Sequence, residues 1–292
     1  MDLIYIARKY KNKRVLLIVI LVILLLIYTI LASKNISNKR KELEKQTAKT
    51  QAEISENEAE TEVSNNNKGR VVQLTETGKN NIENIYKSEA KRVFLTFDDG
   101  PSKKITVPIL DLLKEQDIKA SFFVLGNRVE LYPDIVKREY EEGHYIANHG
   151  YSHVYSQVYS SVQSVLDEYN KTNDCIKIAI GNGEYNSNIF RFPGGLKGGK
   201  YSELKQEAAN LLRDNNIAYV DWNALSGDAE GITDIDALVE RVKQTTANKN
   251  SVVLLMHDAG DKTYTLDALP RIIEYLREEG YEFLNFYDIM SP

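Results

Sequence analysis

At residues 93–101 the sequence reads Val93-Phe94-Leu95-Thr96-Phe97-Asp98-Asp99-Gly100-Pro101. The short apolar run at its start predicts a buried strand, and the Gly-Pro pair predicts the turn that ends it. Asp98 and Asp99 therefore lie at a strand exit, where two neighbouring carboxylates repel each other. A metal ion would offset this repulsion by binding one carboxylate and leaving the other free as a base.

Similar apolar, β-rich runs recur along the chain and alternate with helical patterns. The predicted strands are 93–97, 120–125, 144–148, 188–192, 217–222, 251–256 and 281–285. The helical patterns cover 109–113, 135–140, 158–169, 204–212, 235–242 and 266–276. This alternation predicts an α/β domain over residues 91–292, with parallel strands and covering helices. Seven strands fit an open doubly wound sheet or a closed barrel, and the pattern alone does not choose between them.

The N-terminal part of the chain has a different composition. Residues 15–32 form an apolar run that follows a basic tail at 1–14. As a helix the run would be about 26 Å long, close to the thickness of a bilayer's hydrocarbon core. We therefore predict a transmembrane anchor, with a cleaved signal peptide as the alternative. The basic tail favours a cytoplasmic N-terminus, although basic residues after the run weaken this bias.

Residues 33–90 are predicted to be a polar linker followed by a lead-in segment, because their first part is too polar to bury a core. Ile82, Ile85 and Tyr86 give the lead-in segment an amphipathic spacing. The formal net charge is −5, and the basic tail makes the remainder more acidic still. An acidic body argues against nucleic acid as a partner. The single cysteine, Cys175, excludes an internal disulfide and a thiolate metal site, and no feature points to a protein partner.

Histidines follow two further predicted strands. The segment Asn148-His149-Gly150-Tyr151-Ser152-His153 comes after the third strand, and His257 ends the sixth. His149 and His153 are four residues apart, so one helical turn would place both rings on one face, near a shared metal. The fourth histidine, His144, opens the third strand and is predicted to be structural.

Each of these motifs has an ordinary structural explanation when taken alone. The Asp pair could cap a helix, a single His-x-x-x-His pattern could be chance, Arg191 could be a surface residue, and Trp222 could be core. However, Arg191 ends the fourth predicted strand, and the carboxyl ends of parallel strands meet on one face. We therefore expect the acids, the histidines and Arg191 to converge there.

The converging residue types favour metal-assisted hydrolysis. One Asp and two His form a three-ligand site with a position open for water, which is typical of catalytic zinc. A second carboxylate, a separate histidine and an arginine would supply a base, an acid and an orienting cation. This inventory suits hydrolysis of an amide or an ester.

With these residues in place, the chain resembles the polysaccharide deacetylases of carbohydrate esterase family 4, the NodB-homology domain. The resemblance covers residues 91 to about 288. It is carried by Thr96-Phe97-Asp98-Asp99-Gly100, His149-Gly150-Tyr151-Ser152-His153, Arg191-Phe192-Pro193-Gly194-Gly195 and Leu255-Met256-His257. It implies a distorted (β/α)7 barrel that hydrolyses N-acetyl groups on β-1,4-linked amino sugars. It also implies one divalent metal ion, usually zinc, with cobalt or another divalent ion tolerated.

The resemblance also implies roles for individual residues. Asp99, His149 and His153 would hold the metal, and Asp98 would be the general base. Arg191 would keep Asp98 ionised and aimed, and His257 would protonate the departing amine. Asp228 would orient His257, with Asp221 as the alternative.

Four residues are implied or predicted to contact the substrate. The backbone N–H of Gly194 would stabilise the oxyanion, and Trp222 and Leu255 would line the pocket for the acetyl methyl group. Tyr151 is a further substrate-binding candidate. The chain departs from the family at Ala229, where a tryptophan is often found, which puts the wall of the acetyl pocket in doubt. It also has Gly150 where Ser or Thr is frequent, which removes a possible hydrogen bond near the metal but no ligand.

These expectations combine into one functional hypothesis. The chain is predicted to be a single-pass protein of the cell membrane whose extracytoplasmic domain deacetylates a cell-wall glycan, with peptidoglycan N-acetylglucosamine as the first choice. Chitin oligomers, an exopolysaccharide or acetylated xylan are alternative substrates. A catalytically silent glycan-binding protein on the same fold and a cytoplasmic amide hydrolase are alternatives of a different kind.

Overall fold

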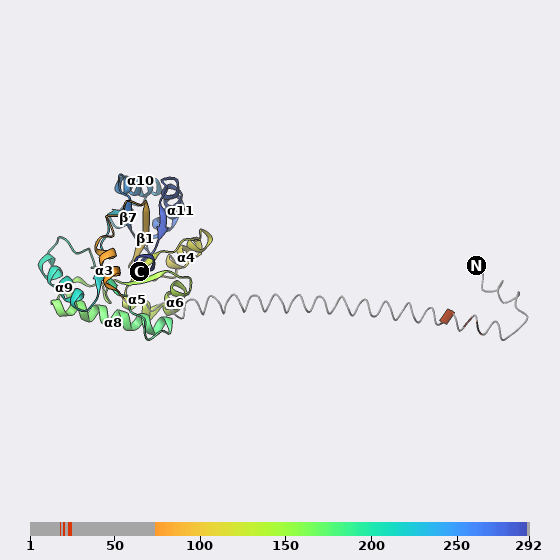
Figure 1. The fold of residues 1–292 in the computed structure, drawn as a ribbon, viewed down its shortest axis with the longest axis horizontal. Coiled ribbons are helices and arrows are strands. Elements are labelled where there is room, and N and C mark those ends of the chain that lie inside the picture. Colours follow the sequence, from red (N-terminus) through yellow and green to blue (C-terminus); the bar gives the residue numbers. More distant parts are fainter. Residues whose placement is uncertain (1–17, 19, 21–22, 25–73, 291–292) are drawn as a thin grey trace, which may run out of the picture. The chain divides into compact units, whose positions relative to one another are not determined.

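The computed structural model describes residues 18, 20, 23–24 and 74–290 (Figure 1). The predicted anchor at 15–32, apart from four residues, and the linker up to residue 73 lie outside this part. Among the described residues, no helix has the length and apolar character needed to cross a membrane. Residues 74–290 carry all the motifs discussed above.

A parallel sheet of eight strands forms the centre of the domain. In chain order the strands are β1 (Arg92–Asp98), β2 (Ser121–Val124), β3 (Tyr145–Asn148), β4 (Ile189–Phe190), β5 (Ala218–Tyr219), β6 (Ala224–Leu225), β7 (Ser251–His257) and β8 (Glu282–Leu284). Their spatial order is β5-β4-β3-β2-β1-β7-β6, and β8 pairs with the first half of β1. Asp98 at the end of β1 lies opposite His257 at the end of β7, so the carboxyl ends of these two central strands are level.

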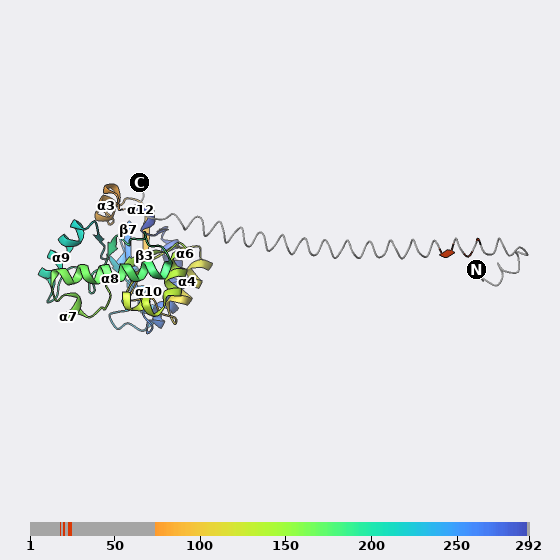
Figure 2. The same cartoon turned by 90° about the horizontal axis from the view of Figure 1, so that it is seen from below.

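Helices connect the strands, and most of them cover the outer face of the sheet. They are α3 (Glu76–Glu83), α4 (Thr106–Glu115), α5 (Gly126–Leu131), α6 (Pro133–Glu141), α7 (Tyr155–Val158), α8 (Val162–Ile180), α9 (Ser202–Asp214), α10 (Ile235–Thr246), α11 (Thr263–Glu278) and α12 (Tyr287–Met290). The longest of them, α8, runs beside β3 (Figure 2). It starts at Ser161 with a reciprocal capping box and ends at Gly181, whose φ of 66° suits a residue without Cβ. The predicted helical run at 158–169 is therefore divided between α7 and α8.

Apolar side chains pack on both faces of the sheet. The outer cluster joins residues of β1, β2 and β7, such as Phe97 and Leu254, to helices such as α4, α10 and α11. The inner cluster contains Phe94, whose ring stacks on Phe286 at 5.7 Å between centroids. Ile82 and Ile85 of the lead-in segment join this inner cluster. The amphipathic spacing predicted there is thus used to cover the inside of the sheet.

The structure corrects the strand count and decides the shape of the sheet. Strand β6 was not predicted, because two residues are too few to give a periodic pattern. It pairs with β7, whereas β5 pairs with β4, and no pairing joins β5 to β6 among the described residues. The sheet is therefore a parallel half-barrel that is open between β5 and β6, and its shape fits the distorted (β/α)7 barrel that the family resemblance implies.

Candidate active site

The two carboxylates that follow β1 have different environments. Asp98 is the last residue of the strand and is 2% exposed, whereas Asp99 is partly exposed. Asp99 has a φ of 74°, a left-handed conformation that Asp adopts more readily than most residues. This change of backbone direction separates the two side chains. Asp98 therefore pairs with Arg191, whereas Asp99 lies beside His149 and His153.

His149 and His153 lie beside Asp99, but on a loop rather than a helix. Their Nε2 atoms are 3.6 and 3.4 Å from Asp99 Oδ1. The predicted helical turn was wrong, because Gly150 and His153 both have positive φ, at 81° and 56°. The tight loop brings the two rings within 5.3 Å of each other without helical geometry.

These three residues offer ligand atoms that all lie within 4.8 Å of one another. Asp99 Oδ1 is buried and accepts no hydrogen bond from the described residues, an arrangement that is costly without a cation. Burial lowers the pKa of His149 to about 3, which keeps its ring neutral. Its Nδ1 is 2.9 Å from the carbonyl oxygen of Arg191, which leaves Nε2 free to act as a ligand. The donor set therefore fits a divalent metal ion.

A residue that the sequence did not single out holds the histidine loop in place. Glu168 of α8 accepts hydrogen bonds from the backbone N–H groups of Tyr151 and Ser152 at 2.6 and 2.7 Å, and from Ser152 Oγ at 2.8 Å. One carboxylate thus satisfies three donors between the two histidines. Gly150 lacks a hydroxyl that could support the loop from within, and Glu168 supports it from outside.

Asp98 is fixed by Arg191, which is fully buried. Arg191 Nη1 donates to Asp98 Oδ1 at 2.7 Å and to Thr96 Oγ1 at 2.9 Å. Its Nε and Nη2 donate to the carbonyl oxygens of Val220 and Asp221 at 3.0 and 3.1 Å, so the guanidinium cannot turn away. Burial raises the pKa of Asp98, and the positive charge of Arg191 opposes but does not cancel this rise. Asp98 is therefore a carboxylate that accepts a proton more readily than an exposed aspartate does.

His257 is paired with Asp228 rather than with Asp221. Its Nδ1 is 2.9 Å from Asp228 Oδ1, and Asp228 Oδ2 accepts from the His257 N–H at 2.8 Å and from Thr265 Oγ1 at 2.7 Å. Burial of the ring alone would lower the pKa of His257, but the hydrogen bond and charge of Asp228 outweigh it and raise the pKa to about 9. The ring is therefore protonated at neutral pH. Asp221 instead accepts from the Leu196 N–H at 3.1 and 3.2 Å.

The four residues predicted to contact the substrate have different surroundings in the structure. Gly194 is exposed, with a φ of 75°, and a Cβ there would meet Tyr155 Oη at 2.3 Å. Trp222 lies against Gly195, and Leu255 is a buried residue of β7. The hydroxyl of Tyr151 donates a hydrogen bond to Glu130 Oε2 of α5 at 2.8 Å.

A second acid that the sequence did not single out, Asp258, lies next to His257 in the chain. It is fully buried, and Thr106 Oγ1 donates to its Oδ2 at 2.5 Å. Its N–H donates to the carbonyl oxygen of Asp98 at 3.1 Å. A Cβ on Gly100 would lie only 2.1 Å from Asp258 Oδ2, so glycine is needed at the turn after the Asp pair. Burial raises the pKa of Asp258 to about 7.

Comparisons with known proteins agree with this geometry. A family model described as polysaccharide deacetylase matches residues 86–214. YheN of Bacillus subtilis, whose name describes it as a polysaccharide deacetylase, is 31% identical to this chain over 271 residues. These residues cover 91% of this chain and 88% of YheN. A peptidoglycan-N-acetylglucosamine deacetylase of Bacillus cereus is 33% identical over 204 residues, or 68% of this chain and 71% of that protein. The solved structure of a CE4 esterase from Streptococcus mutans is 31% identical, with a TM-score of 0.62 over 71% of this chain and 90% of that one.

Proposed function

This chain belongs to the polysaccharide deacetylase family, and from that premise we propose that it removes N-acetyl groups from N-acetylglucosamine in peptidoglycan, with release of acetate. It is a hydrolase of amide C–N bonds. The observation that carries the proposal is the convergence of a metal-binding triad, a buried Asp–Arg pair and a His–Asp pair at the carboxyl ends of the strands. The name of the Bacillus cereus relative supports the choice of polymer.

Asp99, His149 and His153 would hold the divalent ion, and we propose zinc because two imidazoles and one carboxylate suit it. Cobalt or another divalent ion would be tolerated in the same site. When bound, the ion supplies a Lewis acid that polarises the acetyl carbonyl and acidifies water. The protein contributes the fixed positions of the three ligand side chains, two of them through the loop that Glu168 holds.

Asp98 would act as the general base. It takes a proton from the water that attacks the acetyl carbon, while Arg191 keeps its Oδ1 in a single orientation. The backbone N–H of Gly194 would stabilise the negative charge on the carbonyl oxygen. Trp222 and Leu255 would line the pocket of the acetyl methyl group.

His257 would act as the general acid. Because Asp228 raises its pKa to about 9, the ring carries a proton at neutral pH and can donate it to the amide nitrogen as the C–N bond breaks. The amine leaves, the acetyl carbon keeps the oxygen of water, and acetate is released. Base and acid are then restored by proton exchange with solvent.

We further propose the cellular arrangement that the sequence predicts. Residues 1–14 form a cytoplasmic tail, 15–32 a single-pass membrane anchor, and 33–90 the linker and lead-in segment. Residues 91–292 form the extracytoplasmic catalytic domain, with the distorted (β/α)7 barrel of the family. The apolar run at 15–32 and the position of peptidoglycan outside the membrane support this arrangement.

The experiment is acetate release from purified peptidoglycan by the full chain supplied with zinc, followed by mass spectrometry of the muropeptides. We expect a loss of one acetyl group per modified N-acetylglucosamine, and no loss with Asp98→Asn. The proposal is refuted if neither peptidoglycan nor N-acetylglucosamine oligomers release acetate, or if Asp98→Asn releases it at the same rate.

A further inference from the structure

Tyr155 is an exposed tyrosine at the edge of the proposed metal site. It is the first residue of α7, two residues after His153, and its ring lies edge-to-face with the His153 ring at 5.7 Å between centroids. At its other end the hydroxyl lies against Gly194, because a Cβ on Gly194 would overlap Tyr155 Oη. The side chain therefore extends from a proposed metal ligand to the residue whose N–H is proposed to stabilise the oxyanion.

Packing fixes the direction of this side chain. The buried ring of Tyr159 packs against Tyr155 with centroids 5.6 Å apart. The Tyr159 hydroxyl donates to the carbonyl oxygen of Pro193 at 2.7 Å, so a buried hydrogen bond joins this part of the chain to the loop that carries Gly194. Tyr155 is thus held between His153 and Tyr159, with its hydroxyl at that loop.

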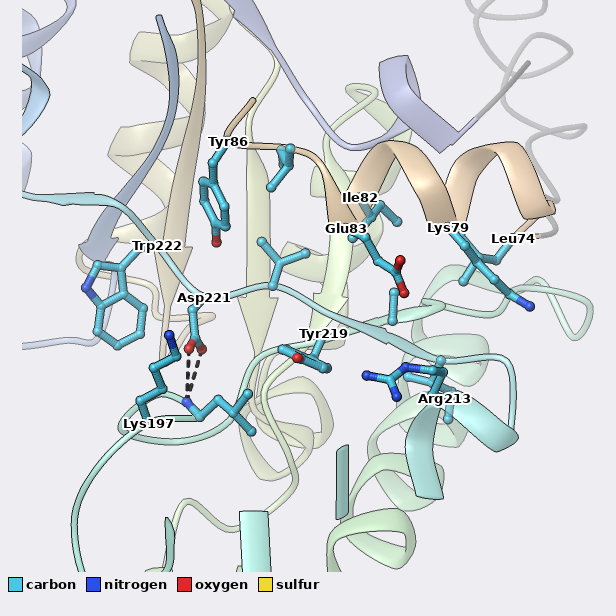
Figure 3. Close-up of a pocket in the computed structure, with 15 residues that line it drawn as sticks. Leu74, Lys79, Ile82, Glu83, Tyr86, Lys197, Arg213, Tyr219, Asp221 and Trp222 are labelled. Atoms are coloured by element: carbon cyan, nitrogen blue, oxygen red, sulfur yellow. Dashed lines mark hydrogen bonds between the residues drawn. The ribbon is translucent and has the colours of Figure 1, made fainter. Parts of the chain in front are cut away.

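The loop that carries Gly194 is itself held at two further points. Lys205 Nζ donates to the carbonyl oxygen of Gly195 at 2.7 Å. Asp221 accepts from the Leu196 N–H at 3.1 and 3.2 Å, and Figure 3, which looks into a cavity of about 560 Å³ beside this loop, shows these two bonds as dashed lines. The loop and the tyrosine hydroxyl that lies against it are therefore organised before any substrate binds.

The Tyr155 hydroxyl is available to a ligand. None of the residues that the structure describes forms a hydrogen bond with its Oη, and the residue is 40% exposed, so a substrate can reach it. A phenol hydroxyl is a neutral hydrogen-bond donor at neutral pH. Tyr159, by contrast, is buried and uses its hydroxyl on Pro193. The two tyrosines therefore differ: Tyr159 ties the loop in place, and Tyr155 offers a donor to the site.

We propose that the Tyr155 hydroxyl is a second hydrogen-bond donor to the acetyl carbonyl oxygen, beside the Gly194 N–H. The inference rests on the proposed function and adds a catalytic residue to it. As water attacks the acetyl carbon, negative charge develops on the carbonyl oxygen. A fixed donor stabilises this charge more than it stabilises the neutral carbonyl of the bound substrate. Tyr155 therefore lowers the barrier without tightening the binding of substrate.

The test is Tyr155→Phe in the full chain supplied with zinc, a change that removes one oxygen atom and keeps the ring. We expect kcat for acetate release from an N-acetylglucosamine oligomer to fall about 10- to 100-fold, because a hydrogen bond to a charged oxygen is lost. KM should change less than about twofold, because the bond strengthens only in the transition state. The matched control is Tyr86→Phe in the lead-in segment, since Tyr86 is also 40% exposed and lines the cavity of Figure 3; it should leave kcat and KM unchanged.

A second measurement separates a catalytic role from a structural one. A methylphosphonamidate analogue of the substrate carries a charged oxygen on a tetrahedral centre, as the transition state does. Calorimetry should show that Tyr155→Phe weakens binding of this analogue by about the same factor as it lowers kcat. The dissociation constants for zinc and for the deacetylated product should change less than about twofold, because neither presents that oxygen.

Any of four outcomes would overturn the inference. An unchanged kcat in Tyr155→Phe would show that the hydroxyl does not contact the reacting oxygen. A rise in KM at constant kcat would assign the hydroxyl to binding of the sugar instead. A weaker affinity for zinc would show that Tyr155 only positions His153, and a fall in kcat without weaker binding of the analogue would exclude the oxyanion contact. If the unaltered protein releases no acetate, the proposed function fails first, and that failure is visible before any variant is made.

Discussion

The pairing of Asp228 with His257 gives the sharpest prediction about catalysis. Asp228→Asn removes the charge that raises the pKa of His257 to about 9, while the burial that lowers this pKa remains. The pKa of the ring should then fall toward its ordinary value of about 6.5, a shift of about 2.5 units or about 3 kcal/mol. At pH 8 the protonated fraction falls from about 90% to about 3%, so kcat should fall about thirtyfold. At pH 6 both proteins keep most rings protonated, and the loss should be much smaller.

The assay is the pH profile of kcat for acetate release between about pH 5.5 and 10. The alkaline limb should move from about pH 9 in the parent protein to about 6.5 or lower in Asp228→Asn. Asp221→Asn is the matched control, because Asp221 does not contact His257, and its alkaline limb should stay in place. An alkaline limb that is unchanged in Asp228→Asn would refute the assignment of His257 as the acid.

The same pair predicts how stability depends on pH. A histidine whose pKa is higher in the folded than in the unfolded chain stabilises the fold fully below about pH 6.5, and this stabilisation is lost as the pH rises through about 9. The difference in unfolding free energy between the parent protein and Asp228→Asn should therefore shrink over this range. Urea unfolding at pH 6 and pH 9 measures it, and a constant difference would contradict the assigned pKa.

Three further predictions concern the base, the histidine loop and the core. Asp98→Asn should lower kcat by about 10²- to 10⁴-fold and leave the dissociation constant for zinc nearly unchanged, as measured by calorimetry; a parallel loss of zinc would contradict its role as a base. Glu168→Gln should weaken zinc binding about 10- to 100-fold with little change in the melting temperature of the metal-free protein, whereas its exposed neighbour variant Asp167→Asn should bind zinc normally. Phe94→Ala should lower the free energy of unfolding by about 3–5 kcal/mol in urea titration, because it removes a fully buried ring that stacks on Phe286; a loss below about 1 kcal/mol would show that the inner cluster is not tightly packed.

The strand ends were predictable because their signal is local. Val93–Phe97 is a strong apolar run, and the residues that follow a parallel strand must lie at the catalytic face whatever the details of the connections. Asp98, His257 and Arg191 were placed together by this rule alone.

The features that were missed depend on tertiary contacts or on single backbone angles. The spacing of His149 and His153 equals one helical turn, and nothing in the spacing shows that Gly150 and His153 adopt positive φ. Glu168 looks like an ordinary polar residue of a helix, and its role appears only when α8 lies beside the histidine loop. Strand β6 is too short to produce a pattern.

The register between β1 and β7 has a mechanical consequence. The proposed proton acceptor, Asp98, and the proposed proton donor, His257, are cross-strand partners on two adjacent strands at the centre of the sheet. Their backbones are held about 4.8 Å apart by the sheet's own hydrogen bonds. The protein therefore needs no hinge or closing flap to bring the two groups together, because the spacing is set when the sheet forms. An insertion of one residue within β7 would shift this alignment and turn the next side chain to the opposite face of the sheet. The backbone pairing that holds the sheet together therefore also sets the positions of the proposed proton acceptor and the proposed proton donor.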